Sequence, residues 1–126
     1  MNREDYDRYV AAFNARDYDT VFDFYAERPR MAFFGIEITN REQLKAFYGF
    51  LHAYVTETVT VEKFASSADL AAVEGIIRIE AFRDLTREDL DANGMEQFFP
   101  IAKGEVQEMR QYIHYHLESG KIASVG

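Results

Sequence analysis

Apolar residues near the start of the chain recur every three or four positions, which is the spacing of one helix face. The first such set predicts a helix over about residues 3–15, with Asn2 as its cap. Asp17 then has the place of a cap for a second helix, "YDTVFDFYAE" (18–27), which Pro29 prevents from continuing. Two short helices packed as a hairpin are therefore expected. The residues on their inner faces are Tyr6, Tyr9, Val10 and Phe13, followed by Val21, Phe22, Phe24 and Tyr25.

The next segment changes from strand to helix. "MAFFGIEI" (31–38) is short, apolar and interrupted by Gly35, which predicts a strand, a turn and a brief second strand. Asn40 followed by Gln43 has the spacing of a capping box, and the helix that it opens should run to about Ala53. The apolar face of this third helix consists of Leu44, Phe47, Tyr48 and Leu51.

From Tyr54 onward the apolar pattern has a period of two, which is typical of strands. It predicts one strand directly after Tyr54, a second over 70–83, a third over 104–118 and a short closing strand over 121–125. Along the second strand alternate residues are apolar, and this face should pack on the helices. These residues are Val73, Ile77, Ile79 and Ala81.

Residues 84–103 separate two of these strands by far more than the usual hairpin loop of about 2 to 5 residues. The segment is either disordered or functional. Its second half contains an apolar cluster that must find a surface, either by capping a pocket or by covering a partner subunit. The cluster is Met95, Phe98, Phe99, Pro100 and Ile101.

Composition narrows the class of protein. The 126 residues, 48% of them hydrophobic and 29% charged, suit one globular domain over 1–126. No cysteine is present, which excludes thiolate catalysis and thiolate metal sites, and three histidines leave little for zinc. A net charge of −8 argues against nucleic acid as a partner. No stretch approaches the length of a membrane span, and the polar N-terminus lacks a signal-peptide pattern, so we expect a cytoplasmic protein with no membrane partner.

The order of these elements resembles a known family. "RYVAAFNARDYD" with "VFDFYAE" is similar to the opening helix pair of ketosteroid isomerases, "NREQLKAFYGFL" to their third helix, and "YIHYHLESGKI" to their closing hairpin. The chain is identified as a member of the nuclear-transport-factor-2-like (NTF2-like) superfamily, which includes the SnoaL-like polyketide cyclases. The resemblance implies a cystatin-like α+β cone, in which three N-terminal helices pack on a strongly curved, mostly antiparallel sheet.

The same resemblance implies where a site lies and which groups it retains. Tyr9 falls at the tyrosine that hydrogen-bonds the substrate oxyanion in the isomerases, and Tyr25 and Tyr48 match two tyrosines that support it. The aspartate base corresponds to Phe33, and the protonated aspartate of the oxyanion hole corresponds to Ile113. Three hydroxyls are thus retained, whereas both carboxyls that carry protons in such a site are replaced. No cofactor is implied.

Strand parity adds further candidates, because alternate side chains of a strand face opposite sides. In the third long strand Gln111, Ile113 and Tyr115 share the inner face, and Glu105 lies on the same side near the strand's start. Glu57 and Glu105 are the inward carboxylates, and Glu105, beneath the long loop, is the better candidate for a catalytic base beside Tyr9. The expected ligand-binding set is Tyr9, Tyr25, Tyr48, Phe33, Gln111, Ile113 and Tyr115.

Other polar residues have simpler explanations. His114 and His116 point outward and lack a third ligand, so we expect no metal site there. Asp17 is explained by its capping role, although related dehydratases have a functional aspartate near this point. His52 lies off the apolar stripe of its helix, which favours a partly exposed side chain. The Tyr9 hydroxyl either bonds to Tyr25, Tyr48 or water within the core, or orients a ligand, and it can do both.

The outward face of the sheet mixes apolar, aromatic and arginine side chains, as protein interfaces do. It predicts a homodimer formed through this face. The residues are Glu74, Ile76, Arg78, Glu80 and Phe82, beside Val106, Glu108, Arg110, Tyr112 and His114.

The sequence as a whole predicts a cavity that binds a small, largely apolar, oxygen-bearing molecule. A catalytic version would be a cofactorless isomerase, cyclase or dehydratase, as the resemblance implies. The alternative is a non-catalytic homodimeric interaction module whose cavity is filled by its own aromatic residues, among 11 Phe and 8 Tyr.

Overall fold

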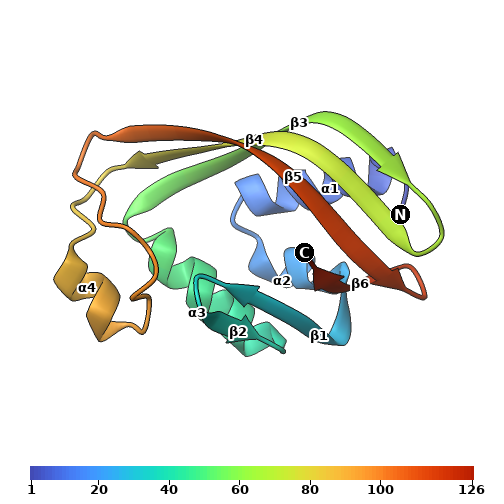
Figure 1. The fold of residues 1–126 in the computed structure, drawn as a ribbon, viewed down its shortest axis with the longest axis horizontal. Helices are drawn as coiled ribbons and strands as arrows, with labels where there is room; N and C mark the ends of the chain where they lie inside the picture. Colours follow the sequence, from blue (N-terminus) through green and yellow to red (C-terminus); the bar gives the residue numbers. More distant parts are fainter.

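The computed structural model describes all 126 residues as helices packed against one bent sheet (Figure 1). The six strands lie in the order β2-β1-β6-β5-β4-β3, and every neighbouring pair is antiparallel except β1 with β6. The helices are α1 (Arg3–Asn14), α2 (Tyr18–Asp23), α3 (Arg41–Leu51) and α4 (Arg87–Ala92). The strands are β1 (Tyr25–Phe33), β2 (Ile36–Ile38), β3 (Val55–Ser66), β4 (Leu70–Ala81), β5 (Val106–Glu118) and β6 (Lys121–Val125). The predicted α+β class with a curved, mostly antiparallel sheet is confirmed.

Side-chain caps begin the first three helices at the predicted positions. Asn2 and Asp5 form a reciprocal capping box at the start of α1. The Asp17 carboxylate accepts hydrogen bonds from the backbone N–H and the hydroxyl of Thr20, which confirms its capping role. Asn40 accepts from the backbone N–H of Gln43 and caps α3. These contacts satisfy N–H groups that have no partner within the helix.

Helix α2 is shorter than the predicted 18–27, because β1 begins at Tyr25. Phe24 and Tyr25 already pair with β6: the Phe24 carbonyl accepts from the Ile122 N–H, and Tyr25 lies opposite Ile122. Pro29 therefore lies within a strand rather than after a helix. Long-range strand pairing has overridden the helical pattern of this segment.

The long strands arch over α1, α2 and α3 (Figure 1). Gly75 lies where the pairing of β3 with β4 is irregular. The pairing of β3 with β4 shifts register between Val61 and Lys63, next to Gly75. A Cβ atom at Gly75 would lie 2.8 Å from the Thr60 carbonyl oxygen. Glycine thus permits the two backbones to approach closely at this bulge. The concave side of the sheet faces the helices.

Residues 84–103, predicted as a long loop, contain a fourth helix. Thr86 and Asp89 form a capping box at the start of α4, and Leu85 and Ile101 pair as an isolated bridge that closes the segment. The Arg87 guanidinium donates to the carbonyls of Met95, Glu96 and Phe98. The segment is therefore ordered around one arginine. Its buried side chains are Leu85, Leu90, Met95, Phe98 and Ile101.

Two glycine substitutions should have opposite effects on stability. Gly75→Ala places a methyl group against a backbone oxygen and should lower the free energy of unfolding by about 1 to 3 kcal/mol. Gly49→Ala, at an exposed position of α3 with open space around it, should raise it by about 0.5 to 1 kcal/mol. Urea unfolding of both variants measures the difference. A stable Gly75→Ala protein would show that the bulge does not need glycine.

Candidate functional site

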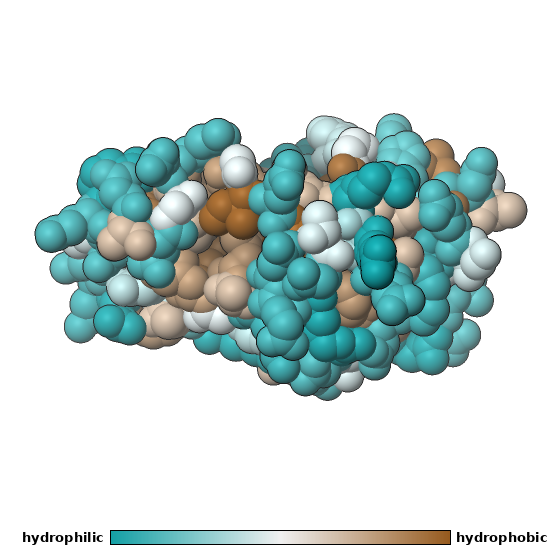
Figure 2. Space-filling view, turned by 90° about the horizontal axis from the view of Figure 1, so that it is seen from below, coloured by the Kyte–Doolittle hydropathy of each residue, from teal (hydrophilic) through white to brown (hydrophobic).

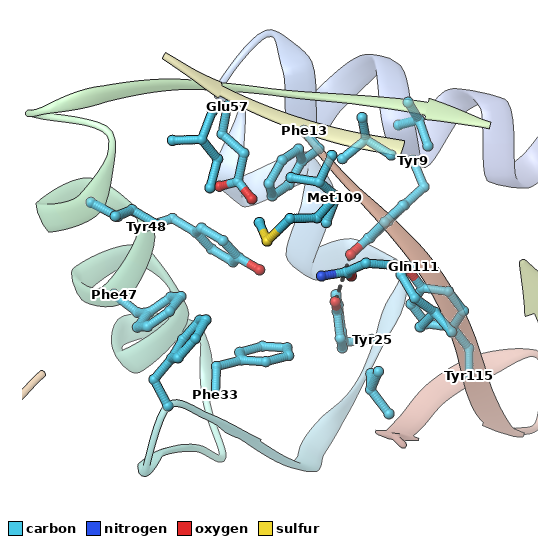
Figure 3. Close-up of a pocket in the computed structure, with 18 of the residues that line it drawn as sticks. Tyr9, Phe13, Tyr25, Phe33, Phe47, Tyr48, Glu57, Met109, Gln111 and Tyr115 are labelled. Atoms are coloured by element: carbon cyan, nitrogen blue, oxygen red, sulfur yellow. Dashed lines mark hydrogen bonds between the residues drawn. The ribbon is translucent and has the colours of Figure 1, made fainter. Parts of the chain in front are cut away.

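A cavity of about 170 Å³ lies between the helices and the concave face of the sheet. Of its 20 lining residues 18 are hydrophobic, and the other two are Glu57 and Gln111. Figure 2 shows a hydrophobic hollow next to the end of the molecule that carries α4. The wall is formed by residues of α1 and α3 and of the strands β1, β3, β4, β5 and β6, so no single sequence motif defines it. Figure 3 shows its central side chains.

Four tyrosines of the wall are joined in two hydroxyl pairs. Tyr9 and Tyr25 are 2.7 Å apart at their oxygens, and Tyr6 and Tyr115 are 2.8 Å apart. The rings of Tyr6 and Tyr9 stack between the pairs at 5.4 Å. Burial raises the pKa of Tyr9, Tyr25 and Tyr115 well above that of a free phenol, so these hydroxyls stay protonated. In each pair one hydroxyl hydrogen forms the bond between the two tyrosines, and the other hydroxyl hydrogen can donate to another group.

Tyr48 and Gln111 differ from these pairs because their polar ends have no partner within the protein. Tyr48 extends from α3 and Gln111 from β5, and both side chains reach toward the centre of the cavity (Figure 3). Burial, followed by the charge of Glu57, raises the pKa of Tyr48. Its hydroxyl is therefore a neutral donor or acceptor that faces the cavity.

His52 and Glu57 form a buried hydrogen-bonded pair at the wall. The Nε2 atom of His52 lies 2.8 Å from a carboxylate oxygen of Glu57, and its Nδ1 atom lies 2.7 Å from the Tyr18 hydroxyl. The two side chains are 2% and 10% exposed. The prediction of a partly exposed His52 is wrong: His52 ends α3, and the turn into β3 carries its ring back between the helices and the sheet.

The positions that correspond to the two missing carboxyls are apolar wall. Phe33 packs against the rings of Phe47 and Tyr48, at 5.8 and 6.4 Å. Ile113 lies on the inner face of β5 and also lines the cavity. All seven residues that the sequence predicts as ligand-binding lie at the cavity wall, although Tyr48 is not bonded to the Tyr9–Tyr25 pair.

Glu105, the predicted base, does not reach the cavity. Its side chain is exposed, and its carboxylate accepts from the backbone N–H of Ala102 and from the side-chain amide of Gln107. Strand β5 begins only at Val106, so the alternation of inner and outer faces does not extend to Glu105. Glu57 is the carboxylate that the structure places in the wall.

Two phenylalanines that the sequence does not connect form part of the cavity's rim. Phe98, from the segment after α4, meets Phe34 edge to face at 4.6 Å, and both line the cavity. Phe34 is 42% exposed and has a φ of 51°, a backbone conformation that is costly for a bulky residue. With Gly35 it forms the two-residue turn between β1 and β2. The expectation that the apolar cluster of this segment caps a pocket is met by Phe98.

Sequence reasoning missed two features of the site, namely Tyr6 and the hydrogen bond between His52 and Glu57. Tyr6 shares the helical stripe of Tyr9, and this spacing was a usable signal. The placement of Phe98 depends on Arg87 and the pairing of residues 85 and 101, which no local pattern reveals.

No three His, Cys, Asp or Glu side chains are grouped so that they could hold a metal ion. His114 and His116 are exposed on the outer face of β5. No helix is long and apolar enough to cross a membrane.

The sequence profile of the SnoaL-like domain matches residues 6–125, which is nearly the whole chain. The protein belongs to the SnoaL-like domain family. No curated protein sequence matches this SnoaL-like domain significantly. The match to the SnoaL-like domain confirms the predicted membership of the NTF2-like superfamily.

Solved structures share the fold of this SnoaL-like domain at low sequence identity. A provisionally assigned polyketide cyclase from Pseudomonas putida KT2440 has a TM-score of 0.72 at 21% identity, over 93% of this chain and 82% of that chain. A protein with a ketosteroid isomerase-like fold from Catenulispora acidiphila, in complex with trimethylamine, has a TM-score of 0.72 at 14% identity, over 99% and 84%. A computationally designed 17-OHP binder has a TM-score of 0.65 at 18% identity, over 93% and 83%.

The tyrosines of the cavity should make the protein sensitive to alkaline conditions. Six tyrosines have a raised pKa in the folded state: Tyr6, Tyr9, Tyr18, Tyr25, Tyr48 and Tyr115. Above about pH 10 the unfolded chain releases these protons while the folded protein retains them. The stability that the raised pKa values contribute is thus complete below about pH 10 and is lost as the pH rises further, by about 1.4 kcal/mol per pH unit for each fully buried tyrosine and by less for the partly exposed Tyr18.

Urea unfolding across this pH range, together with the absorbance of phenolate, measures both effects. We expect the buried tyrosines to ionise only as the protein unfolds. Ionisation of all 8 tyrosines near pH 10, in a protein whose circular dichroism is still native, would contradict the burial of the pairs.

Proposed function

We propose that this protein binds a small, largely apolar molecule with one oxygen-bearing end in the cavity between helices and sheet. The observation that carries the proposal is a contrast within the wall. Apolar side chains line most of the cavity, whereas Tyr48, Gln111 and Glu57 direct polar atoms that have no hydrogen-bond partner in the protein toward one part of it. Small-molecule sites typically combine an apolar wall with a few convergent polar groups.

The size of the cavity limits the ligand. An engineered apolar cavity of about 150 Å³ holds a benzene ring, and pockets for drug-sized molecules occupy about 300 to 1,000 Å³. At about 170 Å³ the present cavity suits a molecule with roughly one ring. A larger ligand requires Phe34 and Phe98 at the rim to move apart.

The predicted tyrosines have different tasks in this proposal. Tyr48 supplies a free hydroxyl, and the Tyr9–Tyr25 pair supplies the one donor hydrogen that its internal bond leaves over. Phe33, Ile113 and the ring of Tyr115 supply apolar wall. The structures of a trimethylamine complex and of a designed 17-OHP binder support the idea that this fold can enclose small molecules.

Cofactorless isomerase, cyclase or dehydratase chemistry is the catalytic form of the proposal, as family membership suggests. The non-catalytic interaction module is less well supported, because it requires a cavity filled by its own aromatic side chains.

The affinities for phenol and toluene separate the contribution of the polar region, formed by Tyr48, Gln111 and Glu57, from that of the apolar wall. Both should bind, and phenol should bind more tightly because its hydroxyl can bond to Tyr48. Tyr48→Phe should weaken phenol roughly threefold to tenfold, the effect of one net hydrogen bond, and leave toluene unchanged. Calorimetric titration measures both affinities.

Tyr112→Phe is the matched control, because it removes one hydroxyl from a side chain that is 72% exposed on the outer face. It should change neither affinity. If phenol and toluene bind equally well to the wild type and to Tyr48→Phe, the polar region has no role in binding.

We also propose that the protein forms a homodimer through the outer face of β4 and β5. Phe82, Val106 and Tyr112 are 44%, 43% and 72% exposed on this face. Arg110 and Arg78 lie among them in ion pairs with carboxylates of β3, β4 and β5. Exposed aromatic and apolar residues between arginines are typical of an interface.

Sedimentation should show twice the 14.6 kDa mass of one chain. Tyr112→Glu adds a negative charge beside Glu74, its neighbour across the strands, and should produce monomers. Glu37→Lys, on exposed β2, should leave the dimer intact. A wild-type monomer at high concentration would contradict the dimer and would leave the cavity proposal untouched.

A further inference from the structure

Glu57 is the one carboxylate in the wall of the cavity, and nine-tenths of its side chain is buried. Burial of a charged carboxylate is costly unless hydrogen bonds compensate it. The chain supplies one such bond, from the Nε2 atom of His52 to one oxygen of Glu57. The other oxygen has no hydrogen-bond partner within the protein and is not itself buried, because it is open to the cavity, where the carboxylate end lies beside Tyr48 and Met109 (Figure 3).

His52 is itself held by neighbouring aromatic rings and at both ring nitrogens. Tyr18 and Tyr48 stack against its ring at centroid distances of 5.8 and 5.4 Å, and Phe13 meets it edge to face at 5.6 Å. The Arg16 guanidinium donates to the His52 carbonyl. Because the ring cannot turn within this packing, it fixes the position of the Glu57 carboxylate.

The chain of hydrogen bonds also determines which atoms donate and which accept. An ionised carboxylate only accepts, so Nε2 of His52 donates to Glu57. In the neutral ring Nδ1 then accepts from the Tyr18 hydroxyl at 2.7 Å. Tyr18 is half-buried on α2, so the line of bonds runs from the cavity to the edge of the molecule. If the His52–Glu57 bond served only to link α3 to β3, the second oxygen of Glu57 would not need to face the cavity.

We propose that Glu57 is the proton-accepting group of this cavity, acting on a carbon acid, with His52 and Tyr18 as positioning residues. This rests on the proposed function, because the acid must first bind. The carboxylate takes the proton of a C–H bond next to a carbonyl group, and the electron pair of that bond moves to the carbonyl oxygen. Where the deprotonated carbon is attached to a carbon–carbon double bond, return of the same proton to the far carbon of that double bond moves the double bond next to the re-formed carbonyl group and completes an isomerisation.

The neighbouring polar groups suit the charge that this step creates. The Tyr48 hydroxyl and the Gln111 amide reach the same space as Glu57 and can donate to the new oxyanion. Tyr48 stays protonated, since burial and the charge of Glu57 raise its pKa. The base therefore belongs to β3, at a position different from Phe33, where the resemblance places the isomerases' aspartate.

5-Nitrobenzisoxazole tests a carboxylate base without knowledge of the natural substrate. A base removes its ring C–H proton, the electron pair forms a carbon–nitrogen triple bond, and the nitrogen–oxygen bond breaks to release a coloured cyanophenolate. No oxidant or further reactant is needed. 5-Nitroindazole has nearly the same shape and cannot react, so it reports binding alone.

We expect the wild type to bind 5-nitroindazole and to convert the benzisoxazole, and Glu57→Gln to lose about 100-fold or more in kcat with binding retained. Glu37→Gln removes an equal charge from the exposed β2 and should keep the full rate. Binding without any difference between Glu57→Gln and the wild type overturns the role of Glu57. Failure of the wild type to bind phenol, toluene and 5-nitroindazole alike overturns the proposed function instead.

Two variants test the positioning residues. Tyr18→Phe retains the stacked ring and should lower kcat about tenfold with KM unchanged, since Tyr18 does not line the cavity. His52→Phe removes the donor to Glu57 and should lower kcat about tenfold with KM unchanged, since His52 does not line the cavity either. An unchanged kcat, in a protein with native circular dichroism, would show that His52 is only structural. Loss of rate in Glu105→Gln but not in Glu57→Gln would reverse the assignment of the base.

Discussion

A polar atom buried without a hydrogen bond is costly, and this constraint divides the polar groups of the cavity into two kinds. Tyr6 with Tyr115, and Tyr9 with Tyr25, meet the constraint by bonding to one another. Tyr48, Gln111 and the second oxygen of Glu57 have no such partner, and they avoid the cost because their polar atoms are open to the cavity rather than buried. The paired tyrosines stabilise the junction of α1 with the sheet, and the other groups are left to orient a bound molecule.

The bent sheet explains why such a space exists. Strands β3, β4 and β5 arch over α1 and α3, with a bulge beside Gly75, and the helices alone do not fill the concave side. The segment after α4 narrows the remaining space, because Arg87 binds three of its carbonyls and thereby places Phe98 at the rim. Fold and site thus depend on the same few contacts.

The sequence predicts the parts of the site that lie within regular elements and fails where the chain leaves them. Tyr9, Tyr48 and Gln111 follow from helix and strand periodicity, and the structure places each at the cavity. Glu105 precedes the start of β5, so strand parity does not apply to it. His52 ends α3 and meets Glu57, five residues later, across a turn that no periodicity describes. α2 is shorter than its pattern suggests, since pairing of β1 with β6 outweighs local preference.

The account depends on one apolar cavity with its polar groups gathered in a single region. A crystal structure of the protein with 4-bromophenol tests this most directly, because the anomalous signal of bromine locates the molecule without ambiguity. The account predicts one site, with the ring among the phenylalanines and the phenol oxygen within about 3.2 Å of the Tyr48 hydroxyl, Gln111 or Glu57. Bromine found only on the outer surface, or a cavity closed by Phe34 and Phe98, would contradict it.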